Sequence, residues 1–157
     1  MAGAVVETGP VTERRQWPMA VAAAGLTVTT PIAVWWLIGD QTEIPPEMDP
    51  DYVVRPVDLD PVVEQAVGTG FTLAVGVTLG LVTWATLRRR DLRPWWSVLL
   101  PVLVAGYLAG AAWRAVTTGV IGANIGAGLM VGLGAPAAGA LLLWAVVRGV
   151  DLLRHHG

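Results

Sequence analysis

The chain has 157 residues, of which 54% are apolar and only 14% are charged, and its mean hydropathy is +0.59. Soluble domains usually carry about 25% charged residues, so this composition excludes an ordinary soluble protein and indicates one membrane domain. The formal net charge is −2, and the lack of cysteine excludes disulfides, thiolate metal sites and thiol nucleophiles.

Residues 1–16 mix small, acidic, Gly and Pro residues without periodicity, and we predict a disordered cytoplasmic tail there. The apolar run at 17–39 predicts roughly 34 Å of helix, which is long enough for a first membrane span. A cleaved signal peptide is the alternative, but its apolar region is usually only about 7–15 residues long. Pro31 lies inside the span and is expected to kink it.

Residues 40–64 are predicted to form an acidic, proline-stiffened loop that contains a single arginine, Arg55. Two Asp-x-Asp pairs, Asp49/Asp51 and Asp58/Asp60, offer the oxygen ligands that hard cations prefer. Neither pair has the glycine or the distal glutamate of a calcium loop, so a solvated loop is the preferred interpretation. We therefore predict no metal site and no cofactor.

The second and third spans, at 65–87 and 95–116, flank a basic turn at 88–94. Small residues form a stripe along each span: Thr69, Thr72, Gly76, Gly80 and Thr83 on the second, and Ala105, Gly106, Ala109 and Gly110 on the third. Lipid provides little hydrophobic force between helices, so small residues favour packing because they let backbones approach closely. We expect the two stripes to pack against each other within one chain, with a homodimer face as the alternative.

The fourth span, at 120–147, would be roughly 42 Å long as one helix, which exceeds a hydrocarbon core of about 30 Å. Glycines crowd its first half and Pro136 interrupts it, so we expect it to tilt, kink or begin outside the hydrocarbon. Its GxxxG pairs lie on different faces, which predicts that it is the most buried span. Residues 148–157 are predicted to be a polar cytoplasmic tail.

The arginines orient this all-α, four-helix transmembrane bundle at 17–147. With four spans, one side carries most of them, at Arg14, Arg15, Arg88, Arg89, Arg90, Arg93, Arg148 and Arg154. By the positive-inside rule both termini are cytoplasmic, the 88–94 turn is an inner turn and the acidic loop is an outer loop of a multi-pass plasma-membrane protein. The tryptophans cluster near the predicted span ends, as interfacial belts do.

Catalytic groups are scarce. Apart from Arg114, the four predicted spans contain no Asp, Glu, Lys, Arg or His, whereas charges at membrane depth usually mark proton or ion paths. Ser97 is the only serine and has no candidate base near it in the sequence, while His155 and His156 lie in the tail. We therefore expect no enzyme.

Three polar residues near the predicted outer rim are candidates for interhelical contacts. Glu64 begins the second span and Arg114 ends the third, so we propose that they form a partly buried ion pair; the alternative is that both extend to water. Asn124, near the outer end of the fourth span, is expected to hydrogen-bond between helices.

Several short motifs together resemble an actinobacterial family of small four-span membrane proteins that is classified as a domain of unknown function. These motifs are Glu64-Gln65-Ala66-Val67-Gly68, Phe71, the arginine turn, Ala112-Trp113-Arg114 and Gly139-Ala140-Leu141-Leu142-Leu143-Trp144. The use of arginine alone as the basic residue fits the GC-rich coding of such a source. The resemblance implies the four-span topology and no known activity.

These observations predict a non-catalytic accessory, scaffold or assembly component of a membrane or envelope complex. Its expected partners are the lipid bilayer and a membrane protein or a second copy, bound through the small-residue faces, with no nucleic acid. The alternative is a small transporter or channel component for a neutral solute, in which Thr69, Thr72 and Thr83 would face water.

Overall fold

The computed structural model describes residues 13–40, 42, 52–121 and 124–155. In chain order the elements are α1 (Glu13–Ile38), α2 (Pro61–Arg88), the 3₁₀ helix η1 (Arg90–Trp95), α3 (Trp96–Thr117), α4 (Ile125–Leu129), the π-helical segment η2 (Met130–Gly134) and α5 (Ala135–His155). Within these residues, 4 helical stretches are long and apolar enough to cross a membrane: Gln16–Ile38, Pro61–Arg88, Arg90–Thr117 and Ile125–Arg154. The all-α prediction is confirmed, and the candidate spans are those expected of a multi-pass membrane protein.

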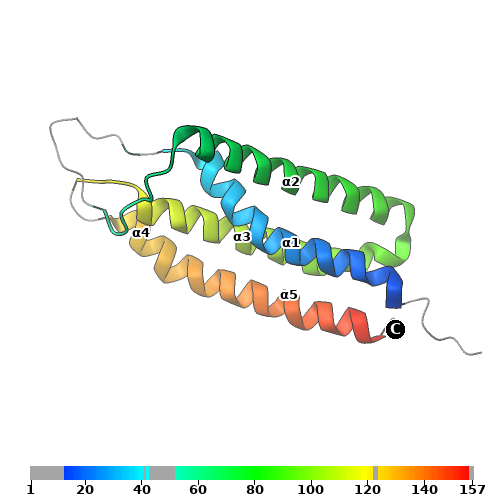
Figure 1. Ribbon diagram of the computed structural model, residues 1–157. Coiled ribbons are helices and arrows are strands. Elements are labelled where there is room, and N and C mark those ends of the chain that lie inside the picture. The colour runs from blue at the N-terminus through cyan, green and yellow to red at the C-terminus, as the bar shows by residue number, and fades with distance from the viewer. Residues whose placement is uncertain (1–12, 41, 43–51, 122–123, 156–157) are drawn as a thin grey trace, which may run out of the picture.

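The helices run back and forth along one long axis, so their connections gather at two ends (Figure 1). The start of α1, the turn between α2 and α3 and the end of α5 lie together at what we call the arginine end. The described residues that follow α1, precede α2 and follow α3 lie at the opposite end, which we call the loop end. This arrangement matches the alternation of the predicted spans.

The third span is the centre of the fold. α3 packs against α1 and against α5, whereas α2 packs mainly against α1. In the most apolar stretch of each span, 44% of residues are buried for the third span, against 22%, 11% and 17% for the first, second and fourth. The prediction that the fourth span is the most buried is therefore wrong, because α5 packs mainly against α3 alone, whereas α3 lies against both α1 and α5.

A proline kink shapes α1. Pro31 has no backbone N–H to bond to the carbonyl of Thr27, and α1 changes direction along its length in Figure 1. α3 approaches this kink closely: a Cβ on Gly106 would lie 2.7 Å from Thr30 Cβ, and one on Gly110 would lie 2.5 Å from the Pro31 carbonyl oxygen. The small residues of the third span thus pack inside the chain, but their partner is α1.

The predicted contact between the two small-residue stripes is wrong. A Cβ added to Gly76 or Gly80 of α2 would meet no atom within 4 Å, and Thr83 is also exposed. α2 instead meets α1 through Gly68, which lies against the indole ring of Trp36, and through buried Val82. At 100° per residue the stripe lies roughly a quarter turn from this contact, so Gly76, Gly80 and Thr83 lie on the exposed flank of α2, while Thr72 is half-buried at its near edge.

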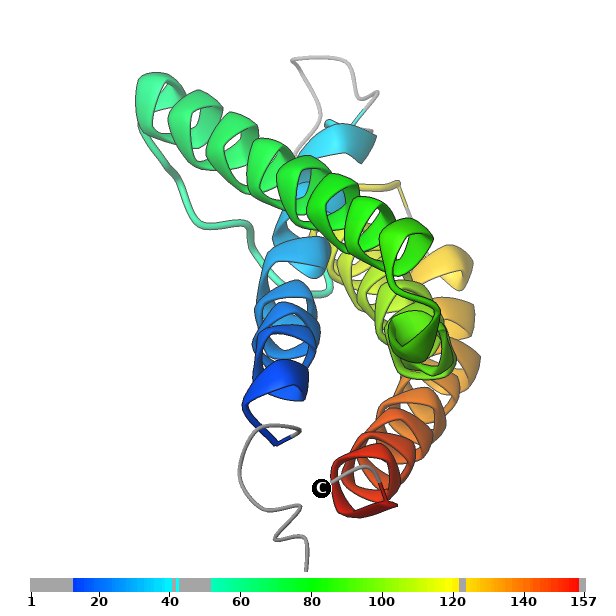
Figure 2. The ribbon, with the colours of Figure 1, turned by 90° about the vertical axis from the view of Figure 1, so that its right-hand side faces the viewer.

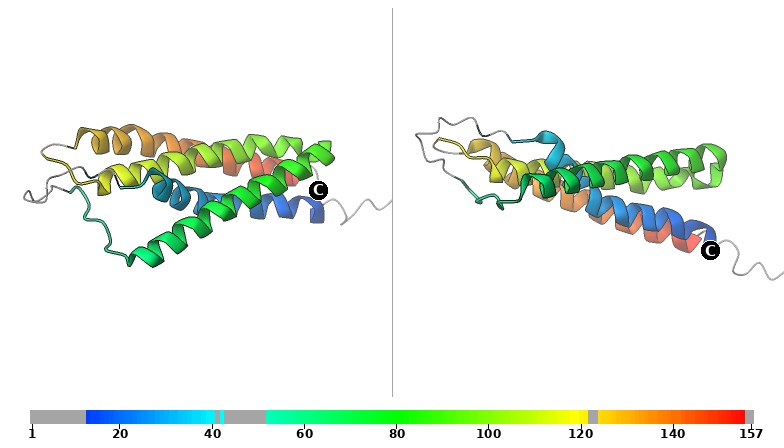
Figure 3. Two further views of the ribbon diagram at one scale, coloured as in Figure 1. Left: turned by 90° about the horizontal axis from the view of Figure 1, so that it is seen from above. Right: turned by 45° about the horizontal axis from the view of Figure 1, so that its top comes forward.

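α2 begins earlier than predicted, at Pro61, inside the expected loop. Asp60 caps the helix: its Oδ1 accepts hydrogen bonds from the backbone N–H groups of Val62 at 2.8 Å and Val63 at 3.4 Å. Proline favours the first helical position, where its missing N–H costs nothing. α2 crosses the other helices obliquely, and its start is spread away from α3 and α4 (Figures 2 and 3).

The fourth span is interrupted where the glycines precede Pro136. The segment from Met130 to Gly134 is π-helical, and the regular helix resumes at Ala135. The proline ring would clash with the carbonyl of Gly132 in a regular helix, and the wider π turn relieves this clash. The expected irregularity in this span is thus present. Gly122 lies outside the described residues.

Side-chain hydrogen bonds fix the arginine end. Trp95 is buried, and the indole N–H of Trp96 donates to Thr86 Oγ1 at 3.2 Å, which ties α3 to the last turn of α2. Ser97 Oγ donates to the Pro94 carbonyl at 2.6 Å and accepts from Arg148 Nε at 3.4 Å. The only serine therefore has a structural role here, joining η1 and α3 to α5.

Candidate functional site

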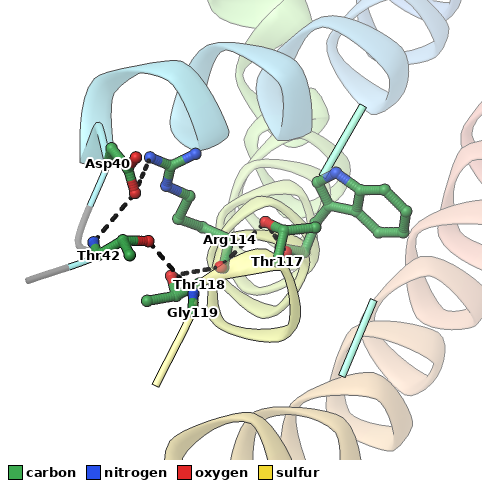
Figure 4. A network of polar contacts seen from close by, with 7 residues as sticks. Asp40, Thr42, Arg114, Thr117, Thr118 and Gly119 are labelled. Carbon is green, nitrogen blue, oxygen red and sulfur yellow. Dashed lines mark hydrogen bonds and ion pairs between the residues drawn. The ribbon is translucent and has the colours of Figure 1, made fainter. Parts of the chain in front are cut away.

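A polar network at the loop end joins the end of α1 to the end of α3 (Figure 4). The guanidinium Nη2 of Arg114 lies 3.2 Å from Asp40 Oδ1, which also accepts a hydrogen bond from the backbone N–H of Thr42 at 3.0 Å. Thr42 Oγ1 in turn accepts from the backbone N–H of Gly119 at 3.2 Å. The network holds the two chain segments that leave the bundle here.

Local sequence places both charges. α1 ends at Ile38, and the next residue, Gly39, has a φ of +69°, the left-handed conformation that glycine adopts easily. The N–H of Gly39 donates to the Trp36 carbonyl at 3.0 Å. The next residue, Asp40, is thereby turned toward α3. Arg114 lies in the last turn of α3, where the helix dipole favours a cation. Its side chain is only 11% exposed, whereas that of Asp40 is 73% exposed.

The predicted pair between Glu64 and Arg114 is wrong, because Arg114 pairs with Asp40. Glu64 lies in the first turn of α2, beside a polar surface hollow that also contains Arg55 and Asp58. The physical reason is the packing order: α3 contacts α1 extensively, so the acid that follows α1 reaches Arg114.

Asn124 does join two helices, as predicted. Its Nδ2 donates to the Ala115 carbonyl of α3 at 2.9 Å, while its Oδ1 accepts from the backbone N–H of Ala127 at 2.8 Å. The side chain thus caps α4 and fixes the start of the fourth span to the last turns of α3.

The acidic pairs make no recognisable cation site in the described chain. Asp60 is used as the helix cap of α2, and Asp49 and Asp51 lie outside the described residues. Among the residues that the structure describes, no three His, Asp or Glu side chains gather closely enough to hold a metal ion.

The segment 52–60, which we call the strap, lies across the loop end and covers a cavity. Its Val54 N–H donates to the Val116 carbonyl at 3.0 Å, which fixes the strap to the end of α3. The cavity has a volume of about 300 Å³. It is lined by Pro31, Ile32 and Trp35 of α1, Pro56, Val57 and Leu59 of the strap, and Gly110, Trp113 and Thr117 of α3.

The lining of the cavity is mainly apolar. Its one hydroxyl, on Thr117, donates within α3 to the Trp113 and Arg114 carbonyls, at 2.9 and 3.1 Å. Sequence reasoning missed this site because the space comes from the bend at Pro31 and from the docking of the strap. The available signals were the proline inside the span and the short alternation of apolar and polar residues from Val57 to Asp60.

Comparisons with protein-family models, with curated proteins and with solved structures find no match to this chain.

Proposed function

We propose that this chain is a non-catalytic accessory or scaffold subunit of a membrane complex, and that it binds a partner membrane protein through the small-residue face of α2. One observation carries the proposal: Gly76 and Gly80 lie mid-span with no atom within 4 Å of an added Cβ. Small residues on an exposed helix face let the backbone of a second helix approach closely, and this approach allows the van der Waals packing that helps to drive helix association in lipid.

The internal packing of α2 supports the same conclusion. Its contacts inside the chain are mainly with α1, and only 11% of the residues in its apolar stretch are buried. Long apolar side chains such as Leu73, Val77 and Leu81 are exposed on the same helix. Such a helix has most of its surface available either to lipid or to a partner.

We also propose an orientation, with the arginine end in the cytoplasm of a plasma membrane. Arg88, Arg89, Arg90 and Arg93 are clustered there, and cytoplasmic loops are enriched in arginine and lysine. At the loop end, Arg114 is paired with Asp40. The resemblance of the short motifs supports placing the chain among the small four-span actinobacterial membrane proteins.

Affinity purification from native membranes in mild detergent tests the proposed function. The tagged full chain is compared with the Gly76→Leu and Gly80→Leu variants. Gly70→Leu is the matched control, because Gly70 lies on another face of the same helix and an added Cβ there would also meet no atom within 4 Å. We expect a stoichiometric partner with the wild type and the control, and its loss with the two stripe variants. Equal recovery from all variants would overturn the proposal, and a homo-oligomer without a foreign partner would favour the channel alternative.

A further inference from the structure

We propose that the cavity between α1, α3 and the strap holds one acyl chain of a bilayer phospholipid. Its volume of about 300 Å³ is at the lower end of the range for ligand pockets, which is about 300–1,000 Å³. The proposal concerns a different face from the α2 stripe and does not depend on the proposed function.

The apolar lining of the cavity favours a hydrocarbon ligand. Trp35, Trp113 and Pro31 supply broad apolar surfaces, and the hydroxyl of Thr117 is already bonded within α3. A polar group that enters this space would lose its water and find few hydrogen-bond partners in the apolar lining, which is unfavourable. An alkyl chain has no polar atom to desolvate, so it is the ligand class that fits the lining.

The position of the cavity indicates a lipid of the surrounding bilayer as the source. Its walls are the ends of two candidate spans, where tryptophans typically lie at the membrane interface. Neither Trp35 nor Trp113 donates its indole N–H to a residue that the structure describes. Trp113 is also 51% exposed, so its side chain is accessible from the surroundings. Ester oxygens of a phospholipid, which lie at this depth, are suitable acceptors for both.

The strap exposes several apolar side chains beside the cavity. Val53, Val54, Val57 and Leu59 are all exposed, Val57 by 74%, although they belong to a connection and not to a span. Exposed apolar side chains that cluster at a rim mark a binding surface for a membrane or a ligand. Because Val57 and Leu59 also line the cavity, a bound acyl chain would cover apolar surface on the strap that is otherwise in contact with water.

Native mass spectrometry of the full chain, purified from membranes in mild detergent, tests the proposal. We expect one phospholipid to remain bound to most wild-type molecules. Val57→Trp, which fills the cavity from an exposed position, should reduce the bound fraction at least fivefold. Val53→Trp is the matched control, because Val53 belongs to the same strap and is exposed but does not line the cavity.

A second control addresses another apolar groove, of about 520 Å³, between α1 and α5. Val146→Trp, which narrows that groove, should leave phospholipid retention unchanged. Wild-type protein without phospholipid, retention of a free fatty acid in its place, or equal retention by the Val57→Trp and Val53→Trp variants would each overturn the proposal. So would loss of lipid in the Val146→Trp variant alone.

Hydrogen exchange gives a readout that needs no variant. The Val54 amide, which donates to Val116, should exchange severalfold more slowly when dioleoylphosphatidylglycerol is added to delipidated wild-type protein. The Arg89 amide, which donates to Ala85 at the opposite end, is the internal control and should not change. An unchanged rate at Val54 would contradict the proposal.

Discussion

Gly110 lies against the bend of α1 so closely that a Cβ atom there would be 2.5 Å from the carbonyl oxygen of Pro31. Backbone, and not the end of a flexible side chain, is the obstacle, so a methyl group forces the two helices apart. We therefore expect Gly110→Ala to lower the free energy of unfolding by about 1–3 kcal/mol, the usual cost of overpacking.

Unfolding in mixed micelles, followed by circular dichroism, measures this effect. Gly76→Ala is the matched control, because it makes the same change at a mid-span glycine that has no atom within 4 Å. Equal midpoints for both variants would show that the crossing of α1 and α3 is not as close as described.

This contact also shows where prediction from sequence ends. The spans, the all-helical fold and the small-residue face of the third span follow from hydropathy and spacing. A small-residue stripe identifies the face of a helix that packs, but not the helix that covers this face. The stripes that contain Gly76 and Gly106 therefore predict a contact with each other no more strongly than a contact with another helix. The choice of α1 depends on the bend at Pro31, which is a three-dimensional property.

The same limit applies to the candidate site. Position along the helix correctly places Arg114 at the loop end, where α1 ends and α2 begins. Which acid it meets depends on the direction in which α1 leaves its bend and on the turn at Gly39. The cavity volume, likewise, is the space left between packed elements and has no pattern of its own in the sequence.

The ion pair of Asp40 and Arg114 should contribute modestly to stability. We expect Asp40→Asn to lower the free energy of unfolding by about 1 kcal/mol or less, because the carboxylate is 73% exposed and screened by solvent. Glu64→Gln removes an acid that Arg114 does not contact, so its effect, about 0.3–1 kcal/mol from the dipole of α2, should be the same in the wild type and in an Arg114→Gln variant. Thermal unfolding in detergent at low and high salt provides the comparison. A smaller effect of Glu64→Gln in the Arg114→Gln variant than in the wild type would restore the pair predicted from sequence.

We expect the hydroxyl of Thr86 to contribute more to the free energy of unfolding than the hydroxyl of Thr83, which is exposed on the same helix. Thr86→Val removes the acceptor of the Trp96 indole N–H and leaves a donor near the η1 turn without that partner. The expected loss of unfolding free energy is about 1 kcal/mol. Thr83→Val is the control, because it makes the same change on the exposed face of α2. If the two variants unfold at the same midpoint, the hydrogen bond from the Trp96 indole does not stabilise the contact between α2 and α3.

The proposed orientation is directly testable because the chain has no cysteine, so a single introduced thiol reports its own location. Val53→Cys places a thiol on the strap and Asp91→Cys places one in the η1 turn, and both positions are exposed. Replacing Asp91 keeps every arginine that orients the turn. In intact cells a membrane-impermeant maleimide should label only the Val53→Cys variant, and the Asp91→Cys variant should react only after permeabilisation. The reverse pattern would place the arginine end outside, which the positive-inside rule disfavours; labelling of both in intact cells would mean that the two ends of the bundle are not separated by a membrane.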